Sequence, residues 1–148
     1  MKPITPVVLI VVATLLIAAS AFASTPPDRA ASPFSFDRLK LIEENLIACL
    51  GSDIPGVRAT AALTLKQLTD LAPDYSFDRS IIPLMRIVKD EACDGPSRIA
   101  AALALHALRS DRGDYAIKMN ARFTRSQRIK HMYEHLALAR SLERQAVR

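Results

Sequence analysis

The chain has 148 residues, a mass of 16.2 kDa and a formal net charge of +5, which suits one ordinary domain and is too little for two separate cores. With 50% hydrophobic and 24% charged residues, a wholly disordered or collagen-like chain is excluded. Because Trp is absent, only 4 Gly are present and Ala, Leu and Arg are abundant, the composition predicts an all-α protein.

Residues 1–23 have the pattern of a Sec-type secretory signal peptide. Lys2 precedes an apolar run over residues 7–19, and the small-residue site Ala21-Phe22-Ala23 precedes Ser24. The run has 13 residues, whereas a membrane-spanning helix needs about 20. No Cys follows the small residues, so a lipid anchor is excluded there. We expect export to the periplasm or the medium, with an uncleaved anchor as the alternative.

The exported part divides into a short leader and one helical domain. Residues 24–34 are rich in Pro and Ser and show no periodicity, so we expect a flexible leader. Residues 35–148 contain an internal repeat. Ser35-Phe36-Asp37-Arg38 recurs 41 positions later, and residues 57–68 match residues 97–108 at an offset of 40 with six identical positions. A third, shorter unit runs to the C-terminus.

Each unit divides into two helical stretches. Apolar residues fall at helical spacing over residues 39–50, 57–68, 81–88, 99–108, 115–123 and 129–142. Loops with Gly and Pro separate the stretches of the first two units, and a turn at residues 124–127 separates those of the third. The pattern predicts helical hairpins that cover most of residues 36–145.

Two helix starts have local signals. Asp37 is a suitable N-cap, with Phe36 and Leu41 placed to form a hydrophobic staple. In the second unit, a cap at Ser80 would make Pro83 the third helical residue, where its missing N–H has no cost.

Export changes the interpretation of the two thiols, Cys49 and Cys93, because disulfides persist in oxidising compartments. We expect a bridge between them, which would stabilise the fold by about 4 kcal/mol in the chain-entropy model. Two reduced, buried cysteines that pack as small hydrophobic residues are the alternative.

A loop with Asp and Pro, then Val57-Arg58, then an Ala- and Leu-rich helix, repeated at forty residues, resembles the second helix of a HEAT repeat; the third unit lacks the Asp-Pro loop. Residues 81–88, with Pro83 in the opening turn, resemble the first helix of such a repeat. The resemblance covers residues 35–142. It implies a small exported HEAT-repeat protein, folded as a short α-solenoid of two to three HEAT-like hairpins with the outer units as caps.

The HEAT resemblance also implies a structural ladder between loop aspartates and helix-start arginines. Here the pairs would be Asp53 with Arg58 and Asp94 with Arg98. In the alternative interpretation, Arg58, Arg98 and Arg128 line one surface and bind an acidic partner.

The sequence His131-Met132-Tyr133-Glu134-His135 has the H-x-x-E-H form of an inverted zincin helix. Only 13 residues follow it, with Glu143 as the available third ligand, so solvent-facing histidines are the expected outcome and a metal site is the weak alternative. His106 is expected to be an edge histidine. No Gly-rich phosphate loop, C-x-x-C pair or G-x-S-x-G elbow is present, and no cofactor is expected.

Positive charge is concentrated near the C-terminus. Residues 118–148 carry eight cations and two carboxylates, and Arg140, Arg144 and Arg148 lie on one stripe at i, i+4 spacing. Such a stripe can bind an acidic protein or an anionic membrane surface, or it can be a solvated cap. Export argues against nucleic acid as the partner.

These observations predict an exported, non-enzymatic protein-interaction or scaffold module with an unidentified, acidic protein partner. The first alternative is a metal-dependent or lyase-type enzyme that uses His131, Glu134 and His135. The second is a binder of anionic membrane surfaces through the basic C-terminal helix.

Overall fold

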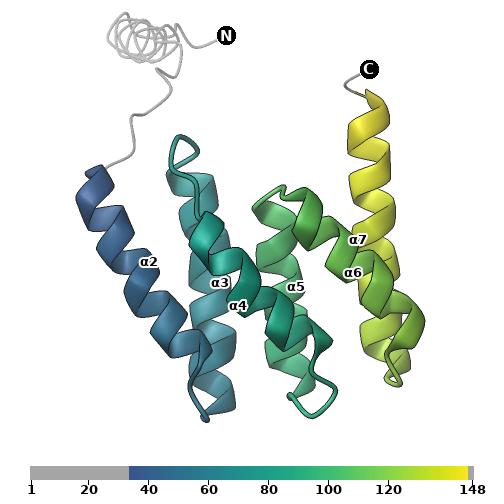
Figure 1. Cartoon of the computed structure of the whole chain (residues 1–148). Coiled ribbons are helices and arrows are strands. Elements are labelled where there is room, and N and C mark those ends of the chain that lie inside the picture. The colour runs from purple at the N-terminus through teal and green to yellow at the C-terminus, as the bar shows by residue number, and fades with distance from the viewer. Residues whose placement is uncertain (1–33, 147–148) are drawn as a thin grey trace, which may run out of the picture. The chain divides into compact units, whose positions relative to one another are not determined.

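The computed structural model describes residues 34–146, and within them every regular element is an α-helix (Figure 1). The helices are α2 (Phe36–Leu50), α3 (Pro55–Leu71), α4 (Asp78–Lys89), α5 (Gly95–Ala107), α6 (Asp111–Phe123) and α7 (Gln127–Ala146). The predicted all-α class is confirmed. The predicted signal peptide, most of the leader and Arg148 lie outside the described residues. In residues 34–146, no helix combines the length and the apolar character needed to cross a membrane.

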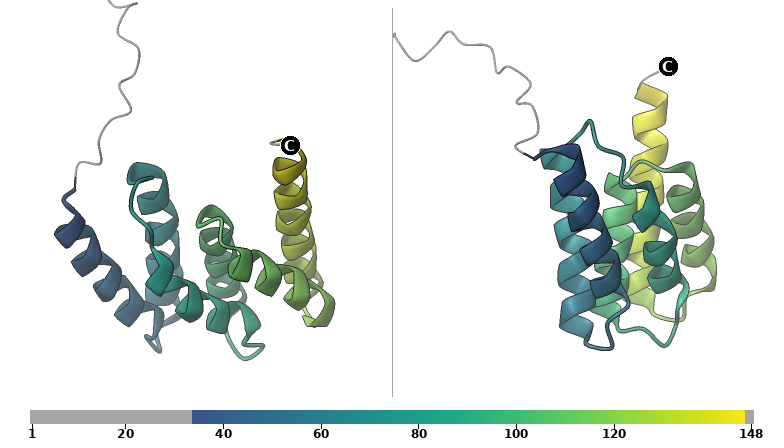
Figure 2. Two further views of the ribbon diagram at one scale, coloured as in Figure 1. Left: turned by 45° about the horizontal axis from the view of Figure 1, so that its top comes forward. Right: turned by 60° about the vertical axis from the view of Figure 1, so that its left-hand side comes forward.

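The six described helices pack as three successive pairs in two layers. α2 packs on α3, α4 on α5 and α6 on α7. One layer holds α2, α4 and α6, and the other holds α3, α5 and α7 (Figure 2). The three helices of one layer run in the same direction, because each pair is antiparallel and is joined to the next by a short connection (Figures 1 and 2).

Small side chains form the contact between α3 and α5. Ala61 and Ala62 of α3 are buried, as are most of the alanines of α5, so the two helix backbones can approach closely. Leu65 and Leu105 fill the remaining space and are fully buried. The Ala-rich second helices predicted from the repeat therefore form the centre of the core.

The predicted start of α2 is wrong by two residues. Ser35 is the N-cap, so Asp37 lies in the first turn. Phe36 and Leu41 are both exposed, so they do not form the predicted staple. The ring of Phe36 instead lies 5.8 Å from that of Tyr75, centroid to centroid. With the cap at Ser35, Phe36 is the first helical residue and no longer the residue before the cap, which is the position that a staple requires.

The predicted start of α4 is also wrong. The helix begins at Asp78, so Pro83 lies inside it rather than in its first turn. Ser80 is fully buried and is not a cap: its N–H and its hydroxyl both donate to Oε1 of the buried Glu43 on α2, at 3.1 and 2.9 Å. This interhelix contact holds the first turn of α4 against α2.

The structure corrects the predicted disulfide. Cys49, at the end of α2, and Cys93, in the loop before α5, are both half-buried free thiols. The Cys93 Sγ lies 3.8 Å from Oδ2 of Asp94, and burial raises the pKa of this thiol. The alternative of two reduced, packed cysteines describes the structure.

Candidate protein-interaction surface

The arginine at the start of α3 connects the first hairpin to the second. Arg58 Nη2 donates to Oδ2 of Asp94 at 2.8 Å, and Nη1 donates to the carbonyl of Ser52 at 2.8 Å. Asp94 also caps α5 by accepting from the N–H of Ser97. Burial alone would raise the pKa of Asp94, but the hydrogen bonds from Ser97 and Arg58 outweigh it and lower the pKa to about 2. The predicted partner, Asp53, was wrong: it is exposed in the loop before α3.

The equivalent arginine of α5 connects the second hairpin to the third. The Arg98 residue is only 2% exposed, and its Nη2 donates to Glu91 Oε1 at 2.6 Å and to Thr124 Oγ1 at 3.1 Å. Nε and Nη2 also donate to the carbonyl of Val88. The predicted pairing with Asp94 was wrong, because that carboxylate belongs to Arg58 of the preceding hairpin.

The hypothesis that the three repeat arginines form one binding surface does not fit this geometry. Arg58 and Arg98 are used between hairpins, and of the three only Arg128, in the first turn of α7, is exposed. A partner could therefore reach Arg128 but not the Arg98 guanidinium.

The C-terminal arginine stripe is paired with carboxylates of α6. Arg140 is nearly buried, with its Nε 3.0 Å from Asp114 Oδ2. Arg144 Nη2 lies 2.6 Å from Asp111 Oδ1 and 2.8 Å from Asp114 Oδ2. Arg148 lies outside the described residues. Arg140 also pairs with Glu143 of its own helix, Nη1 to Oε2 at 2.5 Å. The spacing of the stripe could not show the α6 carboxylates, because they belong to the preceding helix.

Both histidines of the H-x-x-E-H sequence are exposed on α7. His131 Nδ1 lies 3.5 Å from Glu134 Oε2, and His135 faces solvent one turn later. Among residues 34–146, no three His, Cys, Asp or Glu side chains converge in a way that could hold a metal ion. The arrangement offers no third ligand to complete a catalytic site.

His106 lies at the junction of α5 and α7. Its Nε2 is 3.8 Å from Glu143 Oε1, and its buried Nδ1 has no hydrogen-bond partner within the described part of the chain. Burial lowers the pKa of His106, and the nearby Arg140 guanidinium lowers it further. Both effects favour the neutral form of the imidazole.

In the layer that holds α2, α4 and α6, several exposed apolar side chains gather between α4 and α6. The α4/α6 groove has a volume of about 420 Å³. Its lining residues are Ile82, Met85, Arg86, Lys89, Tyr115, Ala116, Met119, Asn120 and Phe123. Ile82, Tyr115 and Phe123 are 44%, 64% and 72% exposed, while Met85 and Met119 are half-buried.

Sequence analysis placed Met85, Tyr115, Met119 and Phe123 on the apolar stripes of their helices but did not identify them as a surface. The stripe on α6 is continuous at i, i+4 spacing from Tyr115 to Phe123. Helical periodicity shows that such residues share a face, but it does not show whether another helix covers that face.

A second apolar groove lies on the opposite layer, between α3, α5 and α7. Its volume is about 360 Å³, and Leu63, Ile99, Leu103 and Ile129 contribute to its walls. Arg128 is the charged residue at its edge. This groove has no aromatic or methionine side chain among its lining residues.

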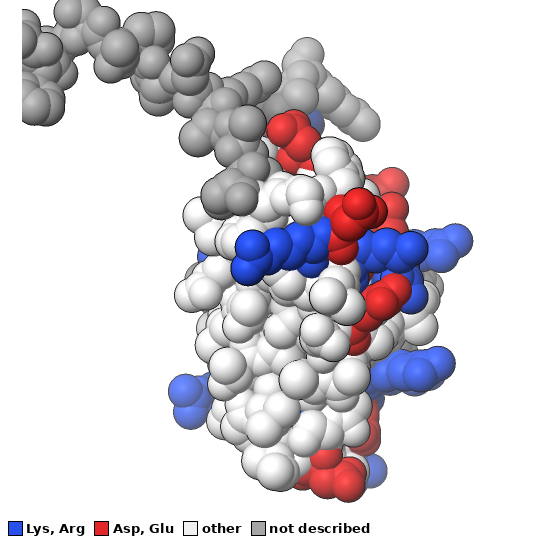
Figure 3. Space-filling model, turned by 90° about the vertical axis from the view of Figure 1, so that its left-hand side faces the viewer, with Lys and Arg blue, Asp and Glu red and all other residues white. Residues whose placement is uncertain are grey.

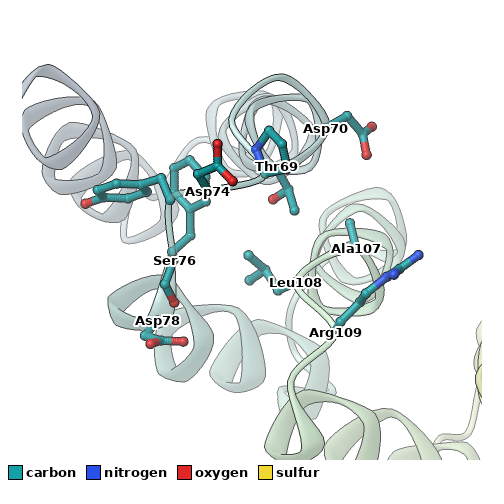
Figure 4. Close-up of a pocket in the computed structure, with 11 residues that line it drawn as sticks. Thr69, Asp70, Asp74, Ser76, Asp78, Ala107, Leu108 and Arg109 are labelled. Carbon is teal, nitrogen blue, oxygen red and sulfur yellow. The ribbon is translucent and has the colours of Figure 1, made fainter. Parts of the chain in front are cut away.

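A polar pocket of about 550 Å³ lies between the α3–α4 connection and the end of α5 (Figure 4). Asp70, Asp74 and Asp78 line it, together with Arg109, which adopts the left-handed φ of 52° just after α5. In Figure 4 the three carboxylates point in different directions, so they do not form a ligand set for a cation.

The surface at the α2 end of the described domain differs from both grooves. Figure 3 shows a broad uncharged area with charged side chains toward its margins. The exposed positions Leu41, Asn45 and Ala48 of α2 are uncharged. No pocket described here is lined by these three residues.

Comparison with known proteins gives no independent assignment: no family model, no curated protein and no solved structure matches the chain. A function must therefore be argued from the surfaces of this protein. Of the surfaces described, the α4/α6 groove combines aromatic, methionine and arginine side chains, which are the types enriched in protein interfaces.

Proposed function

We propose that the mature chain is an exported, non-enzymatic protein-interaction module that binds a partner protein through the α4/α6 groove. In this proposal the domain is a short α-solenoid of three HEAT-like hairpins. The repeat near forty residues supports it, as do the contacts that Arg58 and Arg98 each make with the following hairpin. The export part depends on the signal-peptide pattern of residues 1–23.

One observation carries the binding proposal: Ile82, Tyr115 and Phe123 remain exposed side by side along one groove. Scattered apolar side chains on a surface need no explanation, but a contiguous apolar groove with a charged margin is typical of a binding site. Met85 and Met119 at its base have flexible, polarisable side chains that adapt to a bound surface.

The alternatives have less support from the described residues. His131 and His135 have only Glu134 beside them, which does not provide the three-ligand set of a catalytic zinc. Arg140 and Arg144 already pair with α6 carboxylates, so they would have to break these pairs to bind an anionic membrane. We therefore do not propose an enzyme or a membrane binder.

Site-specific photo-crosslinking tests the proposal. A benzophenone amino acid replaces Tyr115 in the groove or, as the control, the exposed Gln67 on α3, in the full chain expressed in its native cells. We expect a discrete protein adduct after irradiation from position 115 and none from position 67. The same adducts from both positions, or no adduct from position 115, would refute binding through the groove.

A further inference from the structure

We infer that the α4/α6 groove takes an acidic amphipathic helix of the partner protein, an inference that rests on the proposed function. The shape of the groove suggests a helix. Its walls, α4 and α6, lie side by side and run in the same direction (Figures 1 and 2). They contain 12 and 13 residues, so each wall is about 18–20 Å long.

A groove of this length matches about three to four turns of a bound helix. The apolar side chains follow the walls at helical spacing: Ile82 and Met85 on α4, and Tyr115, Met119 and Phe123 on α6. An amphipathic helix presents apolar anchors at i, i+3 or i+4 and i+7, which can lie along such a double row. An extended peptide would find no free strand edge for backbone hydrogen bonds among residues 34–146.

Charge determines the chemistry of this helix. Arg86 and Lys89 occupy the last turn of α4, and Arg122 occupies the last turn of α6. All three are exposed, and none makes an ion pair with another described residue. Because the two helices are parallel, the three cations lie at the same end of the groove.

The carboxylates near this end of the groove do not neutralise the positive charge of the three cations. Glu91 pairs with Arg98, and Asp90 forms no ion pair with a cation of residues 34–146. Asp90 lines the pocket on the other side of Arg86, whereas the lining of the α4/α6 groove contains no carboxylate. A ligand with Asp or Glu over these cations would be attracted, and a basic one would be repelled.

The second groove, on the layer of α3, α5 and α7, lacks the cluster of cations that would favour an acidic ligand. Arg128 is its one charged lining residue, so it offers little electrostatic selection. The charge-selective site is therefore the α4/α6 groove.

Fluorescence anisotropy with synthetic peptides tests the inference on the purified mature chain. The probe is an amphipathic peptide of about 14 residues with a Leu/Phe face and Glu on its flanks. The matched control peptide has Lys in place of every Glu. We expect the Glu peptide to bind, with an affinity that falls as salt rises, and the Lys peptide to bind at least about tenfold more weakly.

Two charge-reversed variants locate the site. The Arg86→Glu/Lys89→Glu variant changes two cations that line the groove, and the Lys40→Glu/Arg128→Glu variant makes the same change in charge at exposed positions outside the groove lining. The first should weaken binding of the Glu peptide by about tenfold, or about 1.4 kcal/mol, and the second by less than about twofold. Circular dichroism should show that both variants keep the helical fold.

Equal binding of the Glu and Lys peptides, or equal loss of affinity in both variants, would overturn the inference. So would a Glu peptide that does not bind. A discrete adduct from position 115 in the crosslinking experiment would leave the proposed function standing in each of these cases, because that experiment does not depend on the charge of the partner.

Discussion

Replacement of Arg98 by Met tests whether the buried guanidinium stabilises the domain by connecting two hairpins. Arg98→Met removes the charge-assisted hydrogen bond to Glu91 Oε1 at 2.6 Å and the bond to Thr124 Oγ1, while the Met side chain keeps much of the packing. Both bonds are donated by the charged guanidinium. Such a hydrogen bond contributes about 1.5–3 kcal/mol, and the cost of burying the arginine itself offsets part of the sum.

The former partners of Arg98 keep other ways to satisfy their polar atoms, which limits the loss in the free energy of unfolding. The Glu91 side chain is 41% exposed, so water can solvate the carboxylate once the arginine is absent. The carbonyl of Val88 still accepts the hydroxyl of Tyr133 at 3.3 Å. We therefore expect a loss of about 2–3 kcal/mol in the free energy of unfolding, rather than the larger penalty of an abandoned buried charge.

Urea unfolding followed by circular dichroism measures this loss. The matched control is Arg128→Met, which removes an exposed arginine and should change the free energy of unfolding by less than about 0.5 kcal/mol. If Arg98→Met were as stable as the control, the contact between hairpins would contribute nothing, and the structural role assigned to this arginine would be wrong.

Further predictions concern pH, packing and thiol chemistry. Because the folded pKa of Asp94 is about 2 and its ordinary value is 3.8, its stabilisation is complete above 3.8 and is lost as the pH falls toward 2; urea midpoints should show that Asp94→Asn removes this part of the acid sensitivity. The folded pKa of His106 is below its ordinary 6.5, so acidification through that value should destabilise the wild type more than His106→Gln, whereas equal slopes would contradict the assigned burial. Leu65→Ala should cost about 2–5 kcal/mol in urea unfolding, because the side chain is fully buried, and a smaller cost would contradict its place in the core. Alkylation without reductant should label both Cys49 and Cys93, and a mass that changes on reduction would instead support a disulfide.

The helices could be predicted because helical periodicity is a local property of the sequence. The predicted stretch over residues 129–142 lies within α7, and the turn predicted at residues 124–127 contains the actual break between α6 and α7. Helix starts were less accurate where a tertiary contact competed with a local signal. Ser80 has the character of a cap, but Glu43 of another helix takes both its donors.

Ion-pair partners could not be predicted because they depend on how one helix is positioned against the next. Arg58 and Asp94 are 36 residues apart, and Arg140 and Asp114 are 26 apart. Arg58 and Arg98 both have structural partners, but neither is the one that the resemblance to HEAT repeats implied. The resemblance paired Arg58 with Asp53 and Arg98 with Asp94, whereas Arg58 pairs with Asp94 of the following hairpin and Arg98 pairs with Glu91 of its own hairpin and with the hydroxyl of Thr124 in the next.

The same geometry separates structural cations from cations that are free to bind. Arg58 and Arg98 stand at the starts of α3 and α5, where the loop of the following hairpin supplies a partner to each. Lys89 and Arg122 stand in the last turns of α4 and α6, where no carboxylate of another hairpin reaches them among residues 34–146. A cation at a helix C-terminus is favoured there by the helix dipole and needs no carboxylate partner. The lysine and arginine at these helix ends can therefore remain exposed beside the apolar groove without cost to the fold, which leaves them available to an acidic ligand.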